Sequence, residues 1–149
     1  MIAKLSVGLT GLLALAMLSG IGETLAETGK LDNSRWTGGI TNTSTDTTCR
    51  SFGAHRIGDG SGWQLAAEIR DERLKGLLTA KPGNNNKHQY SVSAFLGAGR
   101  RLERGTIVFG PYIAKFDGDV HGDRFEAKWF LSAAGEVECR GTIFLVRVK

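Results

Sequence analysis

Long hydrophobic runs, cysteine and proline are scarce in this chain of 149 residues. The longest apolar stretch, Leu5–Leu18, has about 14 residues, whereas an α-helix that spans a bilayer needs about 20. We therefore expect no stable membrane span in the mature chain. The two cysteines have no histidine or acidic residue at metal-ligand spacing, so we predict no metal site at them. Motifs for nucleophilic, acid–base or cofactor chemistry are also missing, and we predict neither catalytic residues nor a cofactor.

The N-terminal segment predicts export. Lys4 supplies a positive charge, Leu5–Leu18 an apolar stretch, and Thr24-Leu25-Ala26 a small-x-small cleavage site, in the order of a secretory signal peptide. We expect residues 1–26 to be a signal peptide cleaved near Ala26. Residues 27–149 then form a single domain in the periplasm or outside the cell, because about 123 residues leave no room for two.

Both cysteines, Cys49 and Cys139, belong to the predicted mature chain. In an oxidising compartment an isolated pair is most simply a disulfide. The bond would close a loop of about 90 residues and contribute on the order of 4 kcal/mol in the chain-entropy model. It would also tie an early strand to the last one.

Short stretches of alternating apolar and polar residues, punctuated by 21 glycines, predict an all-β fold. Apolar residues of one parity recur over 63–69, 90–96 and 125–131, which is typical of strands with one face in a core. We expect turns at 71–72, 97–99, 117–119 and 133–135, and an exposed loop at Lys81–Lys87. Residues 41–48 suit either a wide loop or an edge strand. Residues 142–148 are apolar on both parities, as in a strand that is buried on both sides or that leads into a bulge.

Seven to nine strands with short links favour a single antiparallel meander of about eight strands, closed or nearly closed into a barrel. A β-sandwich is the alternative. Closure removes exposed strand edges, and a Cys49–Cys139 bond would join the two ends of the sheet. The interior of such a barrel is just wide enough for side chains or for one small ligand.

A pattern of tryptophan, glycine and cysteine carries a resemblance. Trp36-Thr37-Gly38, a cysteine shortly after it and Cys139-Arg140-Gly141 near the end resemble small exported β proteins of proteobacteria. The architecture is also similar to that of lipocalins and avidins. Those families carry Gly-x-Trp on the first strand, where this chain has Arg35-Trp36 followed by Gly38, so we carry over no ligand residues from them.

Aromatic residues are the leading candidates for a site. Four of them fall at inward positions of different strands and, together with Phe125, could grip an apolar or planar ligand in the lumen: Trp36, Trp63, Tyr90 and Trp129. The alternative is that they simply fill the barrel.

Charged residues offer weaker candidates. Asp117, Asp119, His121 and Asp123 alternate as in a calcium loop, but Lys128 stands where a glutamate is needed, and a solvent-facing hairpin has the same pattern. The cluster of Arg100, Arg101 and Arg104 suits either an anion or a solvated edge that discourages aggregation. Gly60-Ser61-Gly62 is typical of a turn.

The sequence therefore predicts an exported, non-enzymatic barrel that binds a small apolar ligand or an envelope protein, in its lumen or at the loops of one rim. The alternative is an interaction protein, such as an inhibitor of a periplasmic or host hydrolase, that inserts a loop such as Lys81–Lys87. The net charge of +4 favours acidic partners or anionic envelope polymers. We expect no nucleic acid partner.

Overall fold

The computed structural model describes residues 31–51, 56–133 and 137–149. The predicted signal peptide, His55 and most of the predicted turn at 133–135 lie outside these ranges. The elements are β1 (Ser34–Asn42), α2 (Thr47–Ser51), β2 (Trp63–Arg70), β3 (Arg73–Ala80), β4 (Tyr90–Gly97), η1 (Ala98–Arg100), β5 (Arg101–Phe109), β6 (Tyr112–His121), β7 (Arg124–Ala133) and β8 (Val137–Arg147).

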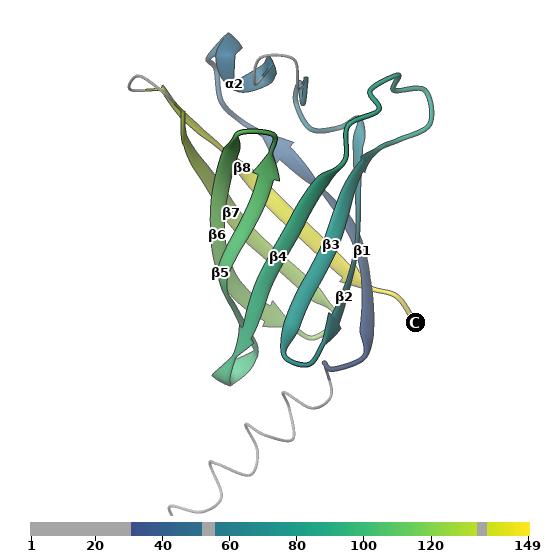
Figure 1. The fold of residues 1–149 in the computed structure, drawn as a ribbon. Coiled ribbons are helices and arrows are strands. Elements are labelled where there is room, and N and C mark those ends of the chain that lie inside the picture. Colours follow the sequence, from purple (N-terminus) through teal and green to yellow (C-terminus); the bar gives the residue numbers. More distant parts are fainter. Residues whose placement is uncertain (1–30, 52–55, 134–136) are drawn as a thin grey trace, which may run out of the picture.

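The eight strands form a closed antiparallel barrel in sequence order (Figure 1). Each strand pairs with the next, and β8 closes the barrel against β1 from Trp36↔Arg147 to Asn42↔Gly141. The predicted all-β meander barrel is thus confirmed, and the sandwich alternative is wrong. Closure pairs the first and last strands, which leaves no free edge among the described strands.

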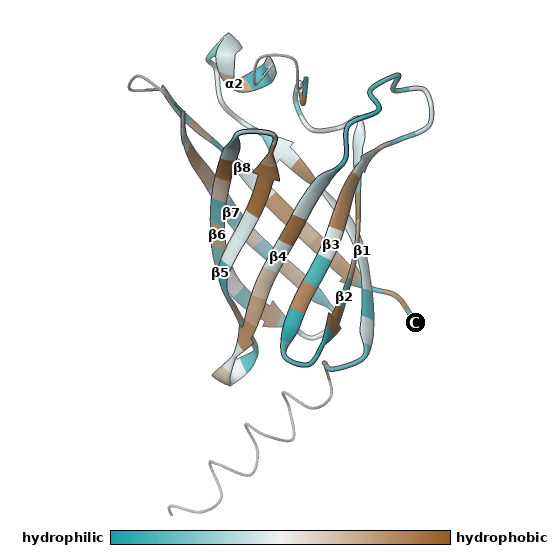
Figure 2. Cartoon of the chain, in the orientation of Figure 1, coloured by the Kyte–Doolittle hydropathy of each residue, from teal (hydrophilic) through white to brown (hydrophobic). Residues whose placement is uncertain are grey.

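Buried and exposed residues alternate along β2 and β4. Hydrophobic and hydrophilic residues likewise follow one another along the strands (Figure 2). The predicted inward parities of 63–69, 90–96 and 125–131 are confirmed. The inward residues of all eight strands form one buried apolar cluster. Its largest fully buried members are Trp63, Trp129, Tyr90, Phe109 and Phe125.

The two ends of the barrel differ. The "turn end" carries the links at 71–72, 98–100 and 122–123, and the "capped end" carries α2 and the β3–β4 loop (Figure 1). The predicted two-residue turn is confirmed, because Asp71 and Glu72 adopt φ values of 51° and 58°.

Three sequence-based expectations are wrong. Residues 117–119 lie inside β6 rather than in a turn. Asp117 and Asp119 occupy outward positions of the strand, where their carboxylates face solvent. Residues 142–148 are buried on one side only, and Phe144 and Val146 are 40% and 45% exposed, because no second layer of described residues covers the barrel. Cys49 lies in α2, not in an early strand.

Candidate functional site

Three of the four predicted lumen aromatics meet at the capped end of the interior. The ring centroids of Trp63 and Tyr90 lie 4.9 Å apart, those of Tyr90 and Phe109 5.1 Å, and those of Phe109 and Trp129 5.9 Å. Trp129 Nε1 donates to Thr41 O at 3.0 Å. The rings therefore pack against one another across β2, β4, β5 and β7.

Trp36, the fourth predicted aromatic, lies in the other half of the barrel. It is 2% exposed, and its Nε1 donates to Ser34 Oγ at 2.8 Å. Ser34 Oγ in turn donates to Leu31 O, and Leu31 is fully buried. A short polar chain thus satisfies the indole N–H beneath the turn end.

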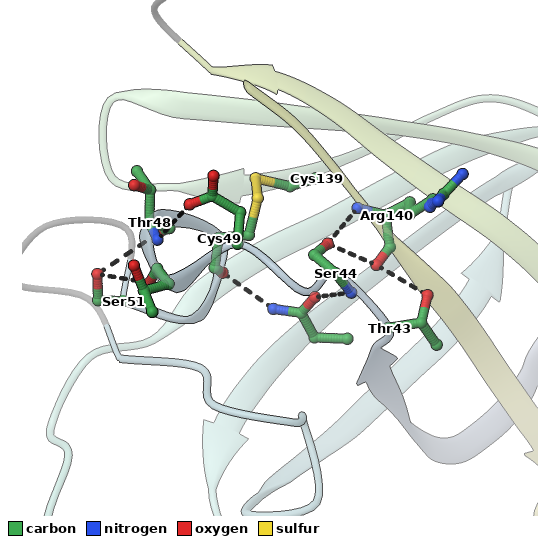
Figure 3. The surroundings of a disulfide bond; sticks show 10 residues. Thr43, Ser44, Thr48, Cys49, Ser51, Cys139 and Arg140 are labelled. Carbon is green, nitrogen blue, oxygen red and sulfur yellow. Dashed lines mark hydrogen bonds between the residues drawn. A yellow bond between two sulfur atoms is a disulfide. The ribbon is translucent and has the colours of Figure 1, made fainter. Parts of the chain in front are cut away.

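The segment of residues 43–51, here called the cap, is fastened to β8 (Figure 3). The Cys49–Cys139 disulfide joins α2 to β8 with the two Cα atoms 5.3 Å apart. Thr43 N donates to Arg140 O at 3.0 Å, and Ser44 Oγ both donates to Arg140 O and accepts from Arg140 N, at 3.1 and 2.8 Å. The predicted disulfide is therefore present, with hydrogen bonds beside it.

The cap also buries side chains over the aromatic end of the interior. Cys49 is fully buried, and Ile57, which follows the cap, is 3% exposed. Asn42 is buried, and its Nδ2 donates to Cys49 O at 2.9 Å while its Oδ1 accepts from Ser44 N. Both amide atoms of the buried Asn42 side chain therefore have hydrogen-bond partners in the cap.

The β3–β4 loop, residues 81–89, stands out from the barrel at the capped end (Figure 1). Two bonds anchor its base to one carbonyl oxygen. Lys81 N donates to Gly62 O at 2.9 Å, and Asn84 Nδ2 donates to the same oxygen at 3.0 Å. The loop is thus tied to the start of β2 as well as to its own strands.

Asparagine side chains order the inside of the loop. Asn84 Oδ1 accepts from Asn86 N at 3.0 Å, and Asn86 Oδ1 accepts from His88 N at 2.9 Å. Asn86 Nδ2 reaches Arg56 O at 3.3 Å. Two consecutive side-chain turns of this kind hold the backbone in one conformation while leaving the outward side chains exposed.

The loop presents cationic groups beside two hollows. Lys81 and Lys87 are exposed, and Arg56 is exposed next to them. A hollow of about 360 Å³ is lined by Arg56 and residues 84–88, and one of about 420 Å³ by residues 79–84 and 86–89. The geometry suits contact with an acidic surface more than enclosure of an apolar molecule.

Charged side chains that were candidates for a metal or anion site bond to other residues of the barrel. Arg101 donates to both Asp117 and Asp119, and the hydrogen bond and charge of Asp119 raise the pKa of Arg101. No group of three or more metal-binding side chains occurs within the described ranges. Arg100 Nη2 donates to Gly122 O at 2.8 Å, so the arginine cluster is divided between separate contacts.

Ser61 lies in a turn, as predicted. Its backbone N donates to Asp59 Oδ1 at 2.8 Å. Hydrogen bonds from the side chain and backbone of Ser61 lower the pKa of the Asp59 carboxyl. The serine thus serves a local turn next to the cap.

Comparisons with protein-family models, with curated proteins and with solved structures found no match to this chain. Over the described residues, no helix is both long and apolar enough to span a bilayer.

Sequence reasoning missed Phe109 and the ordering of the loop. Phe109 was not predicted to face inward because a bulge in β5 interrupts the alternation of apolar and polar residues before it. The run of Asn84, Asn85 and Asn86 was a usable signal for side-chain turns, since asparagine bonds readily to backbone two residues on.

Proposed function

We propose that this chain is an exported, non-enzymatic binding protein that recognises a protein partner through the β3–β4 loop. The observation that carries the proposal is the loop's order: it projects from the barrel, yet side-chain bonds fix its backbone in advance of any contact with a partner. A loop fixed in advance loses less conformational entropy on binding. The Cys49–Cys139 disulfide supports an oxidising compartment.

The partner that suits this loop is an acidic cleft or concave face. Lys87 lines one hollow with Arg56 and the other with Lys81, and all three side chains are exposed. Positive charge of this kind steers association with a negative surface. An extracytoplasmic hydrolase with an acidic cleft is one such partner, which makes inhibition the leading specific role.

The packing of the interior favours the loop over the lumen as the binding region. The predicted lumen aromatics are 0–2% exposed and belong to one buried apolar cluster. A ligand between them would have to displace packed rings, which costs several kcal/mol of lost contacts. We therefore propose that Trp36, Trp63, Tyr90 and Trp129 act as core residues.

The loop proposal is tested by charge reversal. The Lys81→Glu/Lys87→Glu variant should no longer capture proteins from an envelope extract, nor slow any hydrolase that the original protein inhibits. The matched control, Lys75→Glu/Lys149→Glu, changes two exposed lysines elsewhere and should retain both properties. Equal capture by both variants would contradict the proposal.

The lumen is tested by thermal shift. A panel of lipids, haem-like compounds and glycans should leave the melting temperature unchanged. A compound that raises the melting temperature and quenches tryptophan fluorescence would instead show that the binding site lies in the interior. A hydrolase substrate panel should show no turnover above the blank.

A further inference from the structure

A separate hollow of about 550 Å³ lies on the outer wall of the barrel over β5, β6 and β7. Its volume falls within the range of about 300–1,000 Å³ of pockets that hold small organic ligands. We call it the wall hollow. Its buried lining residues, Gly105 and Phe116, form the floor, and its exposed or half-buried ones form the walls: Arg101, Glu103, Arg104, Thr106, Lys115, Asp117, Lys128 and Phe130.

Two irregularities of the sheet meet at the wall hollow. The pairing of β5 with β6 shifts register between Leu102 and Gly105, and its pairing with β4 shifts between Ser93 and Phe95. Arg104, in the same stretch of β5, adopts a φ of 51°. Among the described pairs of β6 and β7, none joins 117–119 to 126–128. Bulges and interrupted ladders are found near binding sites because they bend strands and re-aim side chains.

The wall hollow carries an excess of positive charge, with four cationic side chains and two carboxylates in its lining. Arg101 is already bound to Asp117 and Asp119. Within the described ranges, Lys115 and Lys128 have no carboxylate at ion-pair distance. Two ammonium groups therefore remain to bind an anion.

An exposed aromatic ring stands next to these lysines. Phe130 is 52% exposed and lies directly opposite Lys115 in the β6–β7 register. Lys128 precedes it by two residues on the same outward face of β7. A ligand that reached both lysines could therefore lay an apolar group against the Phe130 ring.

We propose that the wall hollow binds an organic anion, with its carboxylate or sulfonate held by Lys115 and Lys128 and its apolar group packed on Phe130. The Arg101–Asp117–Asp119 network holds one wall of the hollow in place. This site lies on a different face from the β3–β4 loop and is independent of the proposed function.

The proposal is tested by calorimetric titration of the disulfide-bonded protein with 2-naphthoate. Binding should be saturable, weaken with added salt, and be lost for the neutral analogue 2-naphthamide. The Lys115→Gln/Lys128→Gln variant should weaken binding about tenfold or more, since charge-assisted hydrogen bonds are among the stronger ones. Phe130→Ala should weaken it separately.

Matched controls keep the test specific. Lys75→Gln/Lys149→Gln and Phe144→Ala change the same residue types on other exposed positions and should bind naphthoate as the original protein does. Absence of naphthoate binding, equal binding of the amide, or unchanged affinity in the double lysine variant would each overturn the proposal. So would binding to phosphatidylglycerol vesicles without binding to free naphthoate.

Discussion

The two ends of the barrel are built by different means. At the turn end, short links join neighbouring strands, and hydrogen bonds run from the 71–72 turn to Leu96 and Asp32: Leu96 N donates to Glu72 O, and Asp71 N donates to Asp32 Oδ1 across 39 residues, both at 2.8 Å. At the capped end, Ser44 bonds to Arg140 across 96 residues, and a disulfide spans 90. The contacts that fasten the capped end therefore join residues farther apart in the sequence than the contacts cited at the turn end.

This difference shows where the fold leaves room for function. A tight turn leaves little surface to vary, because its residues are occupied in reversing the chain. At the capped end, the β3–β4 loop of residues 81–89 is longer than such a turn and carries the exposed Lys81 and Lys87. Binding surfaces commonly lie on loops held by a rigid scaffold.

Removing the disulfide should produce the largest difference in behaviour between the two ends of the barrel. Replacing Cys49 and Cys139 by serine should lower the free energy of unfolding by about 2–5 kcal/mol, because the unfolded chain regains the freedom of a long loop. Denaturant unfolding measures the loss. Hydrogen exchange should quicken at 43–51 but stay unchanged at 71–72. An unaltered denaturation midpoint would show that the bond does not stabilise the fold.

Alkaline pH should lower the stability of the fold through Tyr90, which lies at the capped end of the interior. Burial raises the pKa of Tyr90 from an ordinary value near 10 to about 12. Below pH 10 the phenol is neutral in both states, whereas between pH 10 and 12 it ionises in the unfolded chain first, so stability falls as pH rises. Denaturation midpoints at about pH 9 and pH 11.5 measure this fall. Tyr90→Phe should reduce this fall.

The hydrogen bonds of the cap should contribute a smaller share. Ser44→Ala removes the two part-buried hydrogen bonds to Arg140 and should lower the free energy of unfolding by about 1–2 kcal/mol. Ser51→Ala, also in the cap but with only long bonds to Thr47 O and Thr48 O, should cost less than about 0.5 kcal/mol. Equal losses in the two variants would mean that the Ser44 bonds do not fasten the cap.

One substitution at the turn end should raise the free energy of unfolding slightly. Glu72 adopts a φ of 58°, which glycine tolerates better than an L side chain. Glu72→Gly should therefore raise the unfolding free energy by about 0.5 kcal/mol, while Glu68→Gly inside β2 should lower it by about 0.5–1 kcal/mol. A loss of stability in Glu72→Gly would show that the Glu72 side chain contributes more than its backbone strain costs.

Local patterns in the sequence determined most of the strands. Alternation alone predicted which side of β2, β4 and β7 faces inward, and it placed four aromatic residues in the interior: Trp36, Trp63, Tyr90 and Trp129. The Asp71-Glu72 turn and the pairing of two lone cysteines also followed from residue type. The strands and the turn depend on neighbouring residues. The disulfide could be predicted because each cysteine has one other cysteine to pair with.

Only the tertiary structure decided the features that depend on distant residues. The bulge in β5 makes both Leu102 and Ile107 face inward although their parities differ, and this places Phe109 among the aromatic rings. The cap became visible only with Ser44 beside Arg140, and the wall hollow only with three strands in register. The physical reason is that alternation is a property of one strand, whereas register, closure and capping belong to contacts between segments far apart in the chain.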